Sequence, residues 1–185
     1  MMAQYYYELL NRQGKAVETN IPDVYAIGDC AEQHEGINGR RPIEAVWYTG
    51  RMMGETLAQT VCGNRIQYNP GHWFNSAKFL DIEYQTYGWV FSERSKQDYE
   101  KHFHWKHEDD TKCITVAYNK DTNKFLGINT FGIRMRHETF DTWLTENRDV
   151  DYVMNHLSEA NFDPEFYSHY EAEILSAYNK QLQIA

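Results

Sequence analysis

Apolar residues recur along this chain with two different periods, and the change between them divides the sequence. Up to about residue 64 the apolar positions form short runs and a helical repeat of three to four residues. Behind the turn at Asn69-Pro70-Gly71 they alternate with polar residues, and after Gly132 the helical repeat returns. The pattern predicts an α+β protein in two parts, residues 1–64 and 65–185. The second part is expected to be an antiparallel sheet with C-terminal helices.

The first part contains two clear patterns. Residues 24–27 form an apolar run bounded by Pro22 and by Gly28-Asp29, which predicts a buried strand that ends in a tight turn. From residue 42 to residue 61, apolar side chains recur at helical steps. This predicts the strongest helix of the chain, which would begin at Pro42 and end at Cys62-Gly63.

Three further features belong to the first part. Gly50 and Gly54 lie one turn apart in the predicted helix, and such spacing favours tight packing against the sheet. Residues 1–12 have the pattern of the end of a helix, which Gly14 would terminate. The loop of residues 33–41 contains His34 and Glu35, either of which could contact a ligand, although a solvated His34 is the simpler expectation.

The second part is predicted to contain strands near residues 80–85, 103–105, 113–118 and 124–130, joined as a meander. Leu80, Ile82 and Tyr84 would form the buried face of the first of these strands. Short helices are expected around Phe140 and across residues 150–157. A terminal helix would follow Pro164, with an apolar stripe that offers a surface for self-association, made of Phe166, Tyr170, Ile174 and Tyr178.

Residues 19–32, TNIPDVYAIGDCAE, place a carboxylate directly after the predicted strand. In open parallel sheets this edge is where cofactors bind, and a charged acceptor there takes strong hydrogen bonds from sugar or polyol hydroxyls. Asp29 and Glu32 also have the spacing of a capping box, which would make Asp29 the cap of a helix that begins at Cys30. One carboxylate can serve both purposes, so the two interpretations are compatible.

The same stretch closely resembles the second flavin-binding motif of the FAD-dependent pyridine nucleotide-disulfide oxidoreductase superfamily. The resemblance implies that Asp29 is held against the ribitol chain of FAD, and that the following helix approaches the flavin ring. Trp47 is equally well explained as a core residue. The cofactor-binding residues that the resemblance implies are Gly28, Asp29, Cys30, Ala31, Glu44 and Trp47.

The chain departs from that family in three respects. Residues 42–47, PIEAVW, lack the Gln or Asn that several subfamilies have there, so the resemblance does not identify which residue contacts the flavin ring. No two of its glycines are separated by a single residue, so the Gly-x-Gly-x-x-Gly turns that receive a pyrophosphate are missing. The redox-active cysteine pair of many members is also missing, and the catalytic residues are unknown. The chain therefore resembles the C-terminal portion of an FAD-dependent NAD(P)H oxidoreductase, comprising the end of the FAD domain and the interface domain. An upstream nucleotide-binding segment or subunit would complete it.

On this interpretation the chain alone would be folded and self-associated but empty of FAD. Its interface domain would make it a homo-oligomer, with residues 24–27 and 43–61 as further association surfaces. The alternative is a non-catalytic interaction or dimerisation module that binds no cofactor. The missing glycine-rich turns favour this alternative for the chain taken alone, whereas the flavin motif favours the oxidoreductase for the parent protein.

Composition and charge limit the classes of partner that the chain is expected to bind. The formal net charge is −9, and no block of Lys and Arg is present, which argues against nucleic acid or an anionic membrane surface. No apolar run reaches the length of a membrane span, and the first residues do not resemble a signal peptide, so a cytoplasmic location is expected. Three widely spaced cysteines suggest neither a disulfide framework nor a zinc site.

A histidine-rich stretch is the other candidate for chemistry. His102 and His104 would share one face of a strand, and acidic residues follow at 108–110, which is how several metal sites begin. The alternative is that Phe103 and Trp105 form the buried face of the strand, which leaves both histidines on the solvent-exposed face. We therefore predict no metal.

Overall fold

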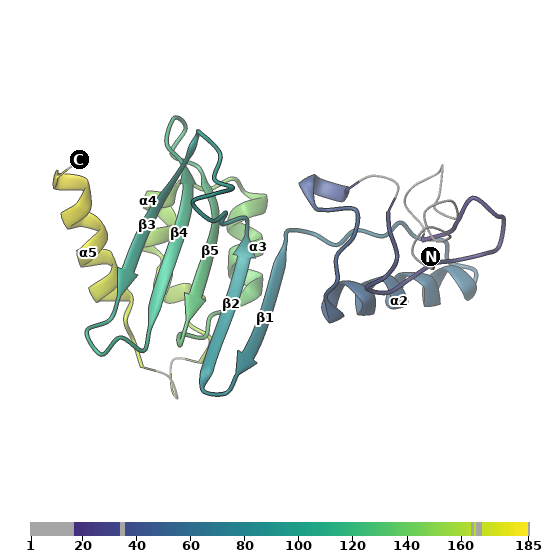
Figure 1. Cartoon of the computed structure of the whole chain (residues 1–185), viewed down its shortest axis with the longest axis horizontal. Helices are drawn as coiled ribbons and strands as arrows, with labels where there is room; N and C mark the ends of the chain where they lie inside the picture. The colour runs from purple at the N-terminus through teal and green to yellow at the C-terminus, as the bar shows by residue number, and fades with distance from the viewer. Residues whose placement is uncertain (1–16, 34–35, 164, 166–167, 185) are drawn as a thin grey trace. The chain divides into compact units, whose positions relative to one another are not determined.

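The computed structural model describes residues 17–33, 36–163, 165 and 168–184. The chain forms two compact units that divide between Gly71 and His72, a few residues beyond the boundary expected from the sequence (Figure 1). The predicted N-terminal helix end, the loop residues His34 and Glu35, and Phe166 of the terminal stripe lie outside the described residues.

The second unit is built on a five-stranded antiparallel sheet. The antiparallel prediction is confirmed, but only β3, β4 and β5 form a meander. The β1–β2 hairpin joins this meander through β2 and β5, and β1 was not predicted from the sequence. The strands are β1 (Phe74–Phe79), β2 (Ile82–Gly88), β3 (Glu100–Lys106), β4 (Cys113–Asn119) and β5 (Phe125–Phe131), in the order β1-β2-β5-β4-β3.

Helices cover one face of this sheet, and the core lies between them. In Figure 1, α3 and α4 lie behind the strands. The register places Phe103, Val116, Ile128 and Tyr87 side by side on the covered face, where all four are buried. The predicted helices of this unit are confirmed as α3 (His137–Thr145), α4 (Val150–Asn155), η2 (Leu157–Ala160) and α5 (Glu171–Ile184).

The predicted phase of β2 is wrong. Leu80 and Ile82 are 93% and 61% exposed, whereas Gln85 and Tyr87 are buried. The pairing of Tyr87 with Ile128 of β5 fixes which side chains point into the core, and a shift of one residue exchanges the two faces of a strand. Leu80 lies in the hairpin turn at φ 53° and is not part of the strand.

The stripe on the terminal helix also has a different role from the one predicted. Ile174 and Tyr178 are buried in the core of their own unit, and the ring of Tyr178 meets that of Phe103 edge to face at 5.3 Å. The Tyr178 hydroxyl donates a hydrogen bond of 2.7 Å to Asp151. Because α5 uses Ile174 and Tyr178 to close the core of its own unit, these two side chains are not available for the predicted self-association.

The first unit contains one long helix, α2 (Trp47–Val61). It begins later than predicted, because the residues after Pro42 are extended. The Gln33 amide donates to the Pro42 carbonyl at 2.8 Å, and Ile43 bridges Glu32. The predicted helix end is confirmed, with Gly63 at φ 89° just beyond it.

The predicted buried strand at residues 24–27 is wrong. Tyr25 forms an isolated antiparallel bridge with Glu18, and Val24 and Ile27 are 42% and 39% exposed. The Thr19 amide donates to the Val24 carbonyl at 2.7 Å, which makes the segment a short hairpin. A single bridging partner covers neither face of the run, so its apolar side chains remain accessible.

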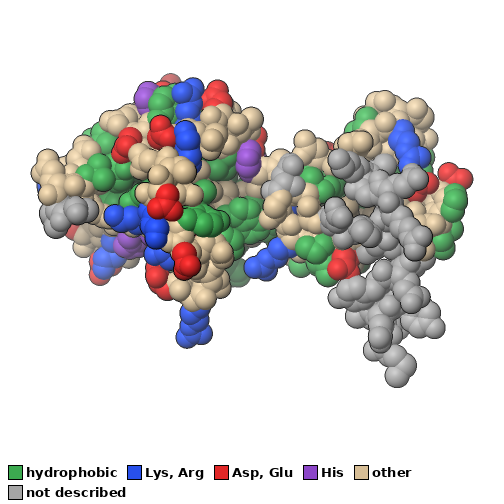
Figure 2. All heavy atoms as spheres, turned by 90° about the horizontal axis from the view of Figure 1, so that it is seen from above, with side chains coloured by type: hydrophobic (Ala, Val, Ile, Leu, Met, Phe, Trp, Pro, Cys, Tyr) green, Lys and Arg blue, Asp and Glu red, His purple; other side chains and the backbone are tan. Residues whose placement is uncertain are grey.

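None of the helices that the structure describes is both long and apolar enough to cross a membrane. On the face shown in Figure 2, Lys and Arg side chains are interspersed with Asp and Glu side chains, with no continuous basic surface.

Candidate functional site

The turn at Gly28 exposes a carboxylate. Gly28 has φ +107°, a conformation that L side chains rarely adopt, and the Ala31 amide donates to the Gly28 carbonyl at 3.2 Å. Asp29 and Cys30 are exposed, and Ala31 is buried. No helix begins at Cys30, so the predicted capping box is wrong. The Asp29 carboxylate accepts no hydrogen bond from residues of the described ranges.

Helix α2 packs closely against this turn. A Cβ atom built on Gly50 would lie 3.3 Å from the Gly28 Cα and 3.7 Å from the Asp29 amide nitrogen. The close approach predicted at Gly50 is therefore confirmed, although its neighbour is a turn and not a sheet. At Gly54 a Cβ would meet nothing within 4 Å, so the prediction of tight packing there is wrong.

The start of α2 lacks a side-chain cap, and its first turn is only partly exposed, because Tyr48 is half-buried and Thr49 is buried. Val46 at the N-cap makes no side-chain hydrogen bond, and the first turn contains no acidic residue. The positive end of the helix dipole is thus not offset by a carboxylate of that turn. Trp47 is 67% exposed, and its ring meets that of Tyr48 edge to face at 5.3 Å. The interpretation of Trp47 as a core residue is wrong for the described chain.

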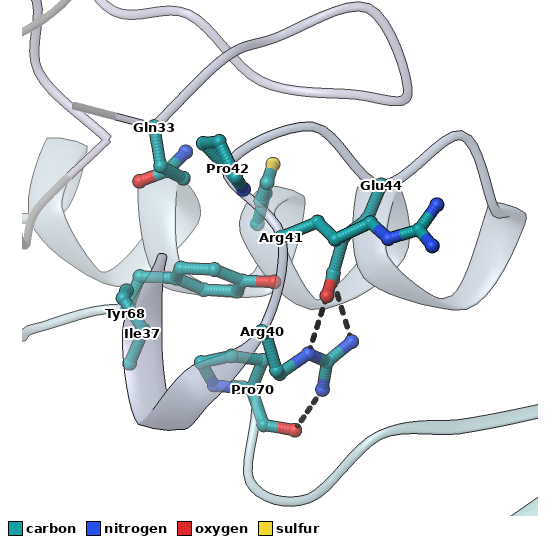
Figure 3. Close-up of a pocket in the computed structure, with 9 residues that line it drawn as sticks. Gln33, Ile37, Arg40, Arg41, Pro42, Glu44, Tyr68 and Pro70 are labelled. Carbon is teal, nitrogen blue, oxygen red and sulfur yellow. Dashed lines mark hydrogen bonds and ion pairs between the residues drawn. The ribbon is translucent and has the colours of Figure 1, made fainter. Parts of the chain in front are cut away.

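Glu44 is buried and engaged by Arg40. The Arg40 Nε and one terminal nitrogen both donate to the Glu44 carboxylate at 2.6 Å, and the other terminal nitrogen donates to the Pro70 carbonyl at 2.8 Å (Figure 3). The Thr49 hydroxyl donates to the same carboxylate at 3.1 Å. Glu44 therefore faces Arg40 and Thr49 within its own unit.

Tyr68 lies beside this ion pair, as Figure 3 shows. Its side chain is 3% exposed, and its hydroxyl has no hydrogen-bond partner among the described residues. Burial raises the pKa of Tyr68 to about 12. A cavity of about 10 Å³, lined by Tyr68, Arg40 and Glu44 among others, is the size of roughly one water.

The structure thus brings some of the predicted cofactor-binding residues together and separates others. Gly28 and Asp29 lie against α2 one turn beyond Trp47, whereas Glu44 is held by Arg40. Sequence reasoning missed Arg40, Thr49 and Tyr68. The spacing of Arg40 and Glu44 by four residues was the only available signal, and the intervening Pro42 argues against the helix that would bring such a pair together.

His102 and His104 of the histidine-rich stretch differ in exposure, because His102 is partly buried and His104 is exposed. His102 lies next to the buried Glu100, with Nε2 2.6 Å from the carboxylate, whereas His104 is exposed and lies 3.0 Å from the Thr115 hydroxyl. The expectation that both imidazoles are solvated is wrong for His102. Within the described ranges, no group of three or more His, Cys, Asp and Glu side chains could hold a metal ion.

Comparison with curated proteins relates most of the chain to NAD(P)H oxidoreductases. The NADH oxidase of Streptococcus pneumoniae serotype 4 is 25% identical over 88% of this chain. A ferredoxin–NAD(P)(+) reductase of Sphingomonas sp is 32% identical over 56% of it. The chain spans only 38% and 23% of the length of these two relatives. No protein-family model matches it.

Solved structures share its fold. The FAD-dependent pyridine nucleotide-disulphide oxidoreductase from Desulfovibrio vulgaris superposes on 95% of the chain with a TM-score of 0.64 and 16% identity. The water-forming NADH oxidase from Lactobacillus brevis bound to NADH also covers 95%, with a TM-score of 0.61 and 12% identity. The chain covers 43% and 41% of these two structures. The fold is therefore that of the reductases, in which this α+β chain corresponds to less than half of a subunit.

Proposed function

We propose that this chain is the C-terminal portion of an FAD-dependent NAD(P)H oxidoreductase and supplies one side of its flavin site and its interface domain. One observation carries the proposal. The exposed carboxylate of Asp29 follows a positive-φ glycine, and this turn packs against the uncapped start of a helix that bears an exposed indole. The sequence relatives, which are named as NAD(P)H oxidoreductases, support the same class of activity.

The residues present fit FAD chemically. Asp29 offers a charged acceptor for ribitol hydroxyls, and Gly28 leaves room for a close approach to the backbone. Trp47 offers an aromatic face for a flat ring. The exposed Cys30 would place its amide toward the cofactor, whereas the Ala31 amide is engaged by the Gly28 carbonyl and supports the turn.

When bound, the flavin would pass electrons from NAD(P)H to an acceptor. The work of this chain's own residues is binding and orientation. Asp29 would fix the polyol, and the positive end of α2 would favour negative charge on the ligand. An upstream nucleotide-binding segment or subunit would hold the pyrophosphate, and we place the complete protein in the cytoplasm as a homo-oligomer.

Titration of the chain with FAD, followed by flavin fluorescence, tests the role of Asp29. Asp29→Asn removes a charged acceptor from hydroxyl groups. It should weaken binding by about 1.5 to 3 kcal/mol, which is roughly tenfold or more. Asp23→Asn is the matched control, because Asp23 is exposed in the same unit and its φ of 63° suits asparagine. Equal affinity of the two variants would contradict the assignment.

A non-catalytic association module is the second candidate, and a specific observation favours it. Among the described residues of the first unit, seven large apolar side chains are exposed: Ile21, Val24, Ile27, Ile43, Trp47, Val61 and Ile66. Surfaces of this kind drive association. Both candidates predict a self-associated chain that is purified without FAD, so the response to millimolar added FAD separates them. No binding at that concentration supports the module, whereas binding that Asp29→Asn weakens supports the flavin site.

A further inference from the structure

The buried ion pair of the first unit lies where solvent cannot compensate its charges. The Arg40 and Glu44 side chains are 2% and 6% exposed, and their nearest nitrogen and oxygen are 2.6 Å apart. The cavity beside them has about 10 Å³, which is room for about one water. Such a pair stabilises a fold weakly compared with apolar packing, and its best-attested use is to select one arrangement.

The pair and its neighbours connect three segments of the unit. Arg40 follows the short 3-10 helix η1 (Ile37–Gly39), and Glu44 lies two residues before the N-cap of α2. Thr49, in the first turn of α2, accepts a hydrogen bond from Arg40 at 3.3 Å and donates one to Glu44 at 3.1 Å. Arg40 also reaches Pro70, at the end of the unit.

These bonds reach the first turn of α2 through Thr49. Thr49 directly precedes Gly50, whose backbone packs on Gly28, and Trp47 lies in the same helical turn. A shift of Thr49 would therefore move Trp47 with respect to Asp29.

We propose that Arg40 and Glu44 are a positioning pair that fixes the start of α2, and hence Trp47, against the Gly28-Asp29 turn. This inference rests on the proposed flavin site. In it, Glu44 does not contact the flavin, as the resemblance implied, but positions the helix that carries Trp47. The bidentate geometry requires the planar guanidinium, which a lysine cannot supply.

The test replaces the pair by apolar residues of similar size, Arg40→Met with Glu44→Leu. Such replacements often preserve or raise stability, so the variant should remain folded. The first readout needs no flavin. It is the nuclear Overhauser contact between the α protons of Gly50 and Gly28, together with the amide shifts of Trp47 and Asp29. We expect this contact to weaken and both amides to shift.

The second readout is FAD affinity, which should fall roughly tenfold or more. Metal affinity falls by a similar factor when the residues that orient metal ligands are mutated. Lys106→Met with Asp110→Asn is the matched control, since these residues form an exposed ion pair with the same spacing. It should change neither readout. The single substitution Arg40→Lys should weaken the Gly50–Gly28 contact as the double variant does, because lysine cannot form the bidentate pair.

An unchanged contact and unchanged FAD affinity in the double variant would overturn the positioning role while leaving the flavin site intact. Wild-type chain that shows the contact but no response to FAD would overturn the flavin site, and with it the functional part of this inference. If the double variant is unfolded, Arg40→Lys provides the test, and a wild-type contact in that variant counts against the role.

Discussion

The interiors of the two units differ in size and in composition. The second unit buries a continuous apolar cluster between its sheet and helices, drawn from every strand except β1 and from each helix behind the sheet. The first unit has only four buried hydrophobic residues among those described: Val17, Ala31, Met53 and Tyr68. Beside them it buries an Arg–Glu ion pair and a tyrosine hydroxyl without a partner.

The candidate site therefore lies in the unit with the smaller apolar core, which we expect to be the less stable of the two. Apolar burial is the main favourable term in folding, so the second unit should hold most of the stability. The first unit has polar contacts that fix geometry and leaves large apolar side chains exposed. Binding elements drawn from low-stability regions are common, and a partner or a cofactor would add to their stability.

The largest effect is expected in the core of the second unit. Phe140 is fully buried, with its ring stacked on Tyr87 at 5.0 Å and edge to face with Trp143 at 5.3 Å. Phe140→Ala should lower the free energy of unfolding of this unit by about 3 to 5 kcal/mol. Leu80→Ala, at a 93% exposed position, should change it by less than about 0.5 kcal/mol. Urea denaturation measures both, and equal costs would contradict the placement of the core.

A pH-dependent effect is expected in the first unit. Burial raises the pKa of Tyr68 from 10.0 to about 12, so the folded state binds the phenolic proton more tightly. The corresponding stability is fully present below pH 10 and is lost as the pH rises toward 12, on the order of 2 kcal/mol in total. Tyr68→Phe should abolish this component of the alkaline destabilisation. A Tyr68→Phe unfolding profile with the same loss between pH 10 and 12 would refute it.

The two histidines of β3 should respond differently to removal. His102→Ala leaves the buried Glu100 with the Phe91 amide, which donates to it at 3.1 Å, and should cost about 1 to 3 kcal/mol. His104→Ala removes an exposed contact with Thr115 and should cost less than about 0.5 kcal/mol. Thermal unfolding compares them, and a larger cost for His104 would reverse our assignment. Neither change should alter the metal content.

The smallest effect concerns the two glycines of α2. Gly54→Ala should stabilise the first unit by up to about 1 kcal/mol, because alanine favours the helix and meets nothing at that position. Gly50→Ala brings the same helical preference but forces the Gly28 backbone to move by a few tenths of an ångström. We expect little or no net gain there, together with shifted amide signals at Gly28 and Asp29. Equal stabilisation by both substitutions would show that α2 does not press on the turn.

Periodicity in the sequence was sufficient to predict much of the second unit. Residues 103–105 alternate between buried and exposed side chains, and residues 113–118 form a mainly apolar run that is β4. Phe140 and Val153 mark helices whose buried faces the structure confirms. Strand β1 escaped prediction because Phe-Asn-Ser-Ala-Lys-Phe has few apolar residues. The phase of β2 was misread because the apolar Leu80 and Ile82 alternate on the face that the structure leaves exposed, whereas the polar Gln85 lies on the buried face with Tyr87.

The first unit was less predictable because its local structure depends on polar contacts between distant residues. Arg40 reaches Pro70, thirty residues away, and no local pattern indicates this contact. Ile43, which directly precedes Glu44 of this network, is extended and bridges Glu32, whereas the apolar spacing alone predicted a helix there. The position of Asp29 at a turn was predicted correctly, because Gly28-Asp29 is a strong local signal. Its place in a flavin site remains a proposal.

Amide mapping of FAD on the isotopically labelled chain tests the central claim most directly, because it locates even weak binding residue by residue. The account predicts that FAD shifts the amides of Gly28, Asp29 and Cys30 together with those at the start of α2, and that Asp29→Asn suppresses these shifts. Shifts confined to the second unit, or no shift at millimolar FAD, would contradict it.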